Sequence, residues 1–238
     1  MLIKDKKSAN KGNALFLVLI AVALFAALSY AVTISGRGTG AKTDQRERNN
    51  LLASELISYG NSIKMVLENM RLLKGVSDLN NDNYGVLFSA PRAHSGYGVF
   101  ENQPKTEIFH HQGGGVLYQF PNEAVCVNPS ECVYDFTGQI NIRDIGRNDR
   151  AELAMIVLGL KEDVCRQINF LTGHGWDYIP QGASIVLNRF SGQNYGELGG
   201  GEINLSGSLN ELEGKYSFCY QEDSGARRYV FVHVINAR

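Results

Sequence analysis

The sequence predicts an α+β protein whose helices come first and whose strands follow. An uncharged run of 21 residues, 14–34, predicts a transmembrane helix. Apolar residues at alternating steps of four and three, from Leu52 to Leu73, predict a second, amphipathic helix. Beyond Gly75, short β-rich runs separated by glycine and asparagine predict a mainly antiparallel β-sheet domain with one further short helix.

The composition is that of a folded chain with a basic start. The 238 residues include 23 Lys and Arg, 24 Asp and Glu, and 44% hydrophobic residues, which excludes a disordered chain. The net charge of -1 gives no electrostatic argument for a nucleic-acid partner. Residues 1–12 carry four lysines against one aspartate, which leaves 19 basic and 23 acidic side chains for the rest.

The apolar run is long enough to cross a bilayer. As a helix it extends about 31 Å, close to the thickness of the hydrocarbon core, so we expect membrane lipid around it. Positive charge stays on the cytoplasmic side, which places residues 1–12 inside and residues 35–238 outside. The alternatives are a buried core helix, which rarely runs so far without a charge, and a cleaved secretory signal, whose apolar region is shorter.

The junction between the basic leader and the apolar run resembles a family. The leader ends in Lys11 and Gly12, and the run follows at once from Asn13. This resembles the N-terminus of type IV prepilins and pseudopilins. The resemblance implies that a prepilin peptidase cuts between Gly12 and Asn13, and that other pilin-like subunits are partners of the mature chain.

Two positions depart from the pattern of that family. Most members begin the mature chain with Phe or Met, where this chain has Asn13, and most have Glu at the fifth mature position, where this chain has Leu17. The resemblance is therefore to the minor subunits, some of which also lack that Glu. The alternative is an uncleaved signal anchor.

Three glycines within residues 35–42 predict a hinge after the transmembrane helix. A second helix is expected to begin at Thr43 or Asp44 and to stop at Gly75. Its apolar stripe comprises Leu52, Leu56, Tyr59, Ile63, Val66, Met70 and Leu73. The stripe fits either a coiled-coil seam or packing on the chain's own sheet, and its length of about three heptads favours the sheet.

The strands are expected late in the chain. They are predicted at residues 116–120, 133–136, 139–142, 152–158, 184–190, 216–221 and 229–235, with a helix as the alternative for 152–158. Thr137 and Gly138 predict one hairpin turn, and residues 222–226 predict another. In the last strand, Tyr229, Phe231, His233 and Ile235 share one face, and three valines share the other. A short helix is predicted at residues 161–171, with Gly173 after it.

All four cysteines follow the transmembrane segment, on the side assigned to the oxidising compartment. An even number there suggests two disulfides, with three pairings open. We expect Cys126–Cys132 and Cys165–Cys219. A zinc site is the alternative, although it normally needs more closely spaced cysteine pairs, and buried free thiols are another.

No motif indicates catalysis or a bound cofactor. His110 and His111 are adjacent and are expected to point apart, which disfavours a shared metal. Residues 78–85 match only the first ligands of a calcium loop. The glycine triplets at 113–115 and 199–201 lack the remainder of a phosphate-binding motif. We therefore expect no catalytic residues and no metal site.

These observations together predict a membrane-anchored protein of a bacterial envelope. Its parts are a cytoplasmic leader (residues 1–12), a transmembrane helix in the inner membrane (13–34), the hinge (35–42) and a periplasmic α+β domain (43–238). The expected function is that of a minor pilin-like or pseudopilin-like subunit of a pilus or type II secretion-like system. The alternative is a signal-anchored binding module that does not polymerise.

Overall fold

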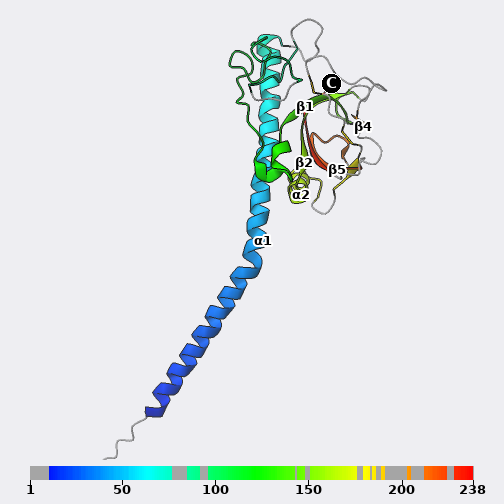
Figure 1. The fold of residues 1–238 in the computed structure, drawn as a ribbon. Coiled ribbons are helices and arrows are strands. Elements are labelled where there is room, and N and C mark those ends of the chain that lie inside the picture. Colours follow the sequence, from blue (N-terminus) through cyan, green and yellow to red (C-terminus); the bar gives the residue numbers. More distant parts are fainter. Residues whose placement is uncertain are drawn as a thin grey trace, which may run out of the picture. The chain divides into compact units, whose positions relative to one another are not determined.

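Four antiparallel strands form the centre of the sheet in the computed structural model (Figure 1). They are β1 (Asp135–Asn141), β2 (Glu152–Leu160), β5 (Ser217–Glu222) and β6 (Tyr229–Asn236). The strand order is β3-β5-β6-β2-β1-β4. The edge strands β3 (Gln181–Gly182) and β4 (Ile203–Asn204) pair in parallel with β5 and β1. The chain is an α+β protein, as the sequence predicts.

The structure describes residues 11–76, 85–91, 96–142, 144–147, 151–175, 179–182, 184–185, 189–190, 203–204, 212–223 and 228–237, with the side chains of 11–14, 34–42 and 203–204 excepted. These residues fall into two units, residues 1–48 and 49–238, which are described separately.

Helix α1 (Lys11–Lys74) contains both of the helical segments that the sequence predicts. The backbone is helical through residues 35–42, where the glycines predict a hinge, and the helix does not restart at Thr43 or Asp44. Three glycines cost about 3 kcal/mol relative to alanine, but each residue that joins an existing helix gains a hydrogen bond. Helix α1 ends as predicted at Gly75, whose φ of 66° suits glycine.

The predicted apolar stripe of α1 packs on the protein's own sheet. Its buried members are Leu52, Leu56, Tyr59, Ile63 and Met70, and Val66 is partly buried against the same core. Leu73 is the exception because it is 81% exposed, and Leu67 takes part in the core although the stripe omits it. The packing of this face on the sheet is the interpretation that the sequence favours.

The two faces of the sheet belong to two apolar cores. On β6, Phe231 and Ile235 face the core shared with α1 and α2 (Glu162–Leu171), whereas Val230, Val232 and Val234 face the second core. This alternation agrees with the prediction for the last strand. Both helices therefore cover one face of the sheet.

Helix α2 and the C-terminal hairpin agree with the sequence-based expectations. Helix α2 begins after Lys161, and the φ of Gly173 is 82°, as expected for a glycine just beyond a helix end. Strands β5 and β6 pair antiparallel, with Cys219 opposite Phe231. Strand β2 also matches its predicted segment.

Three strand predictions are wrong among the described residues. Residues 135–141 form one strand instead of a hairpin, because Gly138 marks a register shift within β1. Residues 116–120 pair with no named strand, and they lie beside α1. In the segment 184–190, the described residues 184–185 and 189–190 are not in a strand. There, backbone amides bond to the Glu222 side chain and to the Phe136 carbonyl.

Candidate assembly surface and membrane anchor

The apolar part of α1 has the properties of a membrane anchor. Residues Leu15–Thr33 have a mean hydropathy of 2.7, and none of them is buried within the protein. The hydroxyl of Thr33 donates to the Ser29 carbonyl at 2.6 Å, so its polar group is satisfied within the helix. Together with the disulfides, this helix fits a membrane-anchored protein with an oxidised domain outside the cytoplasm.

The predicted processing site lies at the beginning of the same helix. The backbone of Gly12 and Asn13 is helical, and their side chains lie outside the described residues. Leu17, which stands where most of the family has Glu, is 59% exposed on α1.

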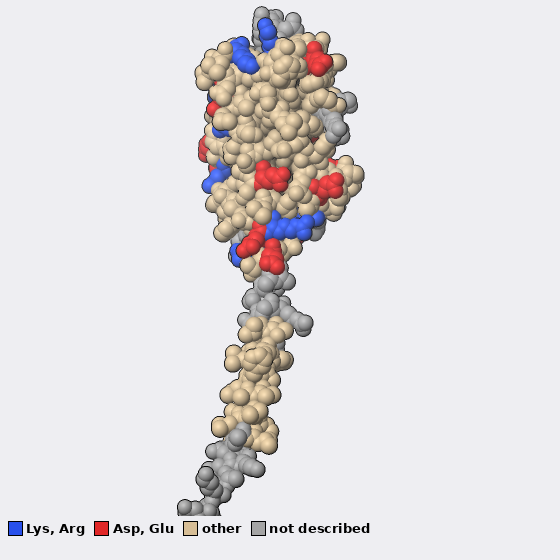
Figure 2. Space-filling view, turned by 90° about the vertical axis from the view of Figure 1, so that its left-hand side faces the viewer, with Lys and Arg blue, Asp and Glu red and all other residues tan. Residues whose placement is uncertain are grey.

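The second half of α1 carries an exposed face opposite the one that packs on the sheet. Leu51, Met65 and Leu72 are 72%, 59% and 82% exposed, and Ser58 completes their seven-residue spacing. We call these four residues the outward seam. Figure 2 shows the side of the domain that α1 borders, where charged side chains are scattered over a mostly uncharged surface. Seven-residue spacing places these side chains in one row along the helix, whereas a complete coiled-coil seam has a second apolar row beside it.

The packed face of α1 comes very close to the sheet at one point. A Cβ atom on Gly60 would lie 2.5 Å from Cδ2 of His233 on β6, so the helix backbone rests on the imidazole ring. Nδ1 of His233 is 2.6 Å from the Ser217 hydroxyl, and Nε2 is buried with no hydrogen-bond partner among the residues that the structure describes. Burial, with a smaller contribution from Lys64, lowers the pKa of His233 to about 4. The ring is therefore neutral at pH 7.

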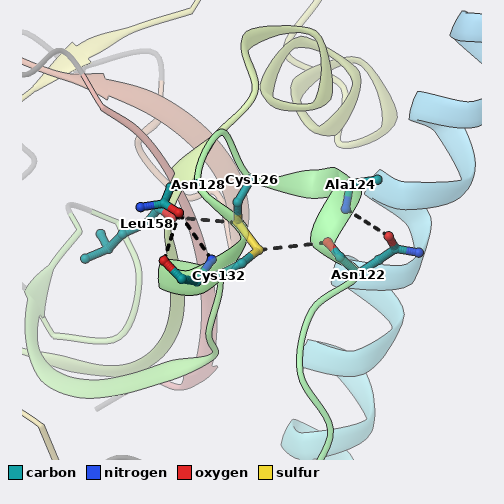
Figure 3. Close-up of a disulfide and its surroundings, with 7 residues drawn as sticks. Asn122, Ala124, Cys126, Asn128, Cys132 and Leu158 are labelled. Atoms are coloured by element: carbon teal, nitrogen blue, oxygen red, sulfur yellow. Dashed lines mark hydrogen bonds between the residues drawn. A yellow bond between two sulfur atoms is a disulfide. The ribbon is translucent and has the colours of Figure 1, made fainter.

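The structure contains the two expected disulfides, Cys126–Cys132 and Cys165–Cys219, so no cysteine is free. The first closes a small loop that contains the 3-10 turn η2 (Pro129–Glu131). Figure 3 shows this disulfide beside the turn η1 (Glu123–Val125). This turn follows residues 116–120, which lie beside α1. The second joins α2 to β5 and thus fixes that helix on the sheet.

A small cavity of about 240 Å³ lies beside the first disulfide loop. Its lining includes Val127, Leu158, Gly159 and Tyr229, with Glu131 and Arg228 as the charged side chains. Gly159 has a φ of 73° at a register shift of β2, and space beside its Cα is open. The cavity is mostly apolar, and it is large enough for one side chain or a similarly small group.

Two buried carboxylates attach loops to the sheet. Asp135 accepts hydrogen bonds from the Tyr97 hydroxyl at 2.7 Å and from Nε of Arg189 at 2.9 Å. Burial, reinforced by Asp135, raises the pKa of Tyr97 well above its usual range. Glu222 accepts two hydrogen bonds from Arg228 at 2.7 and 3.1 Å. Each carboxylate is thus paired with an arginine, which is the usual arrangement of a buried carboxylate with a structural role.

The prediction that the side chains of His110 and His111 point apart is wrong. The rings of His110 and His111 lie together, with centroids 4.2 Å apart, because the chain turns there and is neither helix nor strand. Nδ1 of His110 accepts a hydrogen bond from the backbone of Gln112 at 3.1 Å. In the part of the chain that the structure describes, no three His, Cys, Asp or Glu side chains are grouped to hold a metal ion.

The remaining sequence candidates divide into two groups. Gly113 and Gly114 form a tight turn, where a Cβ would lie 2.0 and 2.3 Å from the carbonyl oxygens of Glu107 and Ile108. They therefore serve close backbone packing. Residues 78–84, almost all of the calcium-like segment, and the triplet 199–201 lie outside the described residues.

Sequence reasoning missed the outward seam and the contact between Gly60 and His233. The spacing of Leu51, Met65 and Leu72 is visible in the sequence, but it was masked by the stronger buried stripe beside it. The sequence does offer one signal for the close contact, because Gly60 lies in the middle of a helical pattern, where a glycine often marks a close approach.

Comparisons of the chain with protein-family models, curated proteins and solved structures find no match.

Proposed function

We propose that this chain is a minor type IV pilin-like or pseudopilin-like subunit of a pilus or type II secretion-like system in a bacterial envelope. In this proposal a prepilin peptidase cuts between Gly12 and Asn13, α1 holds the subunit in the inner membrane, and the α+β domain lies in the periplasm. The subunit acts by assembling with other subunits through α1, and it has no enzymatic activity.

The observation that carries the proposal is that the two halves of α1 differ in their exposure and packing. The part that follows the basic leader is apolar and exposed on all sides. The part from Asn49 onward packs one face on the sheet and leaves the outward seam exposed on the other. A helix with an anchoring half and an exposed row of apolar side chains beyond it is suited to packing beside equivalent helices.

The second candidate is a signal-anchored periplasmic binding module that does not polymerise. The cavity lined by Val127, Leu158 and Tyr229 favours it, because such a cavity could receive an apolar group of a partner. Leu17 favours it too, because the Glu that pairs with a neighbouring subunit in the family is missing.

Crosslinking between outward seams distinguishes the two candidates. Both native disulfides use all four cysteines, so a cysteine introduced at Met65 or Leu72 supplies a single reactive thiol. In native membranes with the full assembly system, and with a crosslinker that joins this thiol to a lysine amine of a neighbour, the pilin-like proposal predicts covalent adducts of Met65→Cys and Leu72→Cys with pilin-like subunits.

The matched control is Glu123→Cys, which is exposed on η1 and is not part of the outward seam. It should give few adducts with the same crosslinker. If the seam variants crosslink no more than this control, assembly through α1 is refuted and the binding-module candidate is preferred.

A further inference from the structure

Another cavity lies at the C-terminal end of α1. Its volume is about 330 Å³, which is within the size range of small-ligand sites, and its lining is mostly apolar. Lys74, the last residue of the helix, and Val76 form one part of the lining. Residues 103–106 and Gln112 form the other part, on the chain that folds around this end of α1 (Figure 1). The cavity is therefore built by two separate segments of the domain.

Hydrogen bonds hold these two segments together. Nζ of Lys74 donates to the Gln112 carbonyl at 2.8 Å and also to the Gly113 carbonyl. Within the second segment, the Thr106 amide donates to the Gln103 carbonyl at 2.9 Å. The walls of the cavity are thus formed by the fold itself, so that a ligand does not have to order them.

The charged side chains that line the cavity are both cationic. They are Lys74 and Lys105, and no carboxylate is part of the described lining. Lys105 is exposed, and it has no ion pair with any of the described residues. The carboxylate of the nearby Glu107 is buried, and it accepts hydrogen bonds from the amides of Glu101 and Gln103 at 3.0 and 3.1 Å. That carboxylate therefore binds its own loop.

The sign of this charge is opposite to that of the chain around it. Residues 13–238 hold 19 basic and 23 acidic side chains, a net charge of -4. A mostly apolar cavity with two lysines in its lining is therefore a local excess of positive charge. Apolar walls with a few polar groups are typical of sites that hold an apolar ligand by one polar end.

We propose that this cavity binds an organic carboxylate, with the apolar part of the ligand against Val76 and Pro104 and its charged end on Lys74 and Lys105. An ammonium group has three N–H donors, and Lys74 uses two of them on carbonyl groups, so one is left for the ligand. Hydrogen bonds between lysine and a carboxylate are charge-assisted and therefore strong.

A carboxylate fits this cavity better than a phosphate does. The described lining contains no arginine, which is the side chain that suits phosphate by its planar set of donors. Two sources supply a carboxylate on an apolar group, a small free acid and the C-terminal residue of a peptide. The inference goes beyond the proposed function because it requires neither cleavage at Gly12 nor assembly through α1, so its test can fail while that proposal stands.

Calorimetric titration of the full chain in lipid nanodiscs tests the proposal. The probe is 4-phenylbutyrate, and 4-phenylbutanamide is its neutral counterpart of nearly the same shape. Empty nanodiscs measure the heat of partitioning into lipid. We expect the acid to bind at least about threefold more tightly than the amide, and we expect this difference to shrink as the salt concentration rises. An acetylated dipeptide ending in phenylalanine, compared with its C-terminal amide, tests a peptide as the source in the same way.

The variant Lys105→Gln identifies the site. It should weaken binding of the acid about threefold and leave binding of the amide unchanged. Lys161→Gln is the matched control, because Lys161 is also exposed but does not line the cavity. An unchanged melting temperature verifies the fold of both variants. The proposal would be overturned if no carboxylate bound at millimolar concentration, if each acid and its amide bound equally, or if the two variants bound the acid equally well.

Discussion

Gly60 of α1 and His233 of β6 are in direct contact, and this contact sets how closely the helix approaches the sheet. The nearest ring atoms would lie 2.5 and 2.6 Å from a Cβ on Gly60, where no side chain can fit. The contact places a neutral, buried imidazole between the two elements that form the main core.

Gly60→Ala should therefore destabilise the domain, although alanine favours helix by about 1 kcal/mol. We expect a net loss of about 1–3 kcal/mol, because the added methyl group forces the helix away from β6. Thermal unfolding of the full chain in detergent, followed by circular dichroism, measures this loss. Asn61→Ala is the matched control on the exposed side of the helix and should change the melting temperature little. A smaller loss for Gly60→Ala in a His233→Ala background would identify the ring as the obstacle.

His233 should also make the stability depend on pH. Its pKa is lowered in the folded state, from 6.5 to about 4, so the unfolded chain takes up a proton more readily. The stabilisation is complete above pH 6.5 and is lost as the pH falls toward 4, by about 3 kcal/mol in total. His233→Gln should remove this part of the slope. Denaturant titrations of both proteins between pH 7 and pH 4 measure it, and parallel pH profiles would refute the assignment.

The two disulfides should differ in their contribution to stability. Cys165 and Cys219 are 54 residues apart, so their bond restricts the unfolded chain more than that of Cys126 and Cys132, which are six apart. The chain-entropy relation gives about 4 kcal/mol for the long loop and about 2 kcal/mol for the short one. Comparing the melting temperatures of the two double-alanine variants tests this order. An equal or reversed order would show that local contacts outweigh loop entropy.

The apolar half of α1 should be needed for membrane retention. Leu24→Arg places a charge near the middle of the segment Leu15–Thr33, at a cost of about 2.5–3.5 kcal/mol for insertion. We expect more of this variant in the carbonate-soluble fraction. Leu51→Arg, in the exposed face of the domain, is the control and should stay with the membrane. Unchanged retention of Leu24→Arg would argue against a membrane-spanning role.

The sequence was sufficient where a single local pattern decides the structure. The buried stripe of α1, the alternation along β6, helix α2 and the stop at Gly75 all follow from periodicity and backbone preference. Both cysteine pairs also match the structure, because few pairings are open to four cysteines.

The sequence was insufficient where tertiary contacts decide. Gly138 is typical of a turn, yet pairing with β2 keeps it within β1 as an irregularity. Residues 116–120 have the composition of a strand, but α1 occupies one side of them and the described chain provides no strand partner. The contact of Gly60 with His233 joins positions 173 residues apart, which no local pattern reveals.

The most direct test of the central claim is the intact mass and N-terminal sequence of the chain purified from native membranes. The pilin-like account predicts a chain that begins at Asn13, and it predicts that Gly12→Asp retains the leader. A wild-type chain that still begins at Met1, in cells with an active prepilin peptidase, would contradict that account.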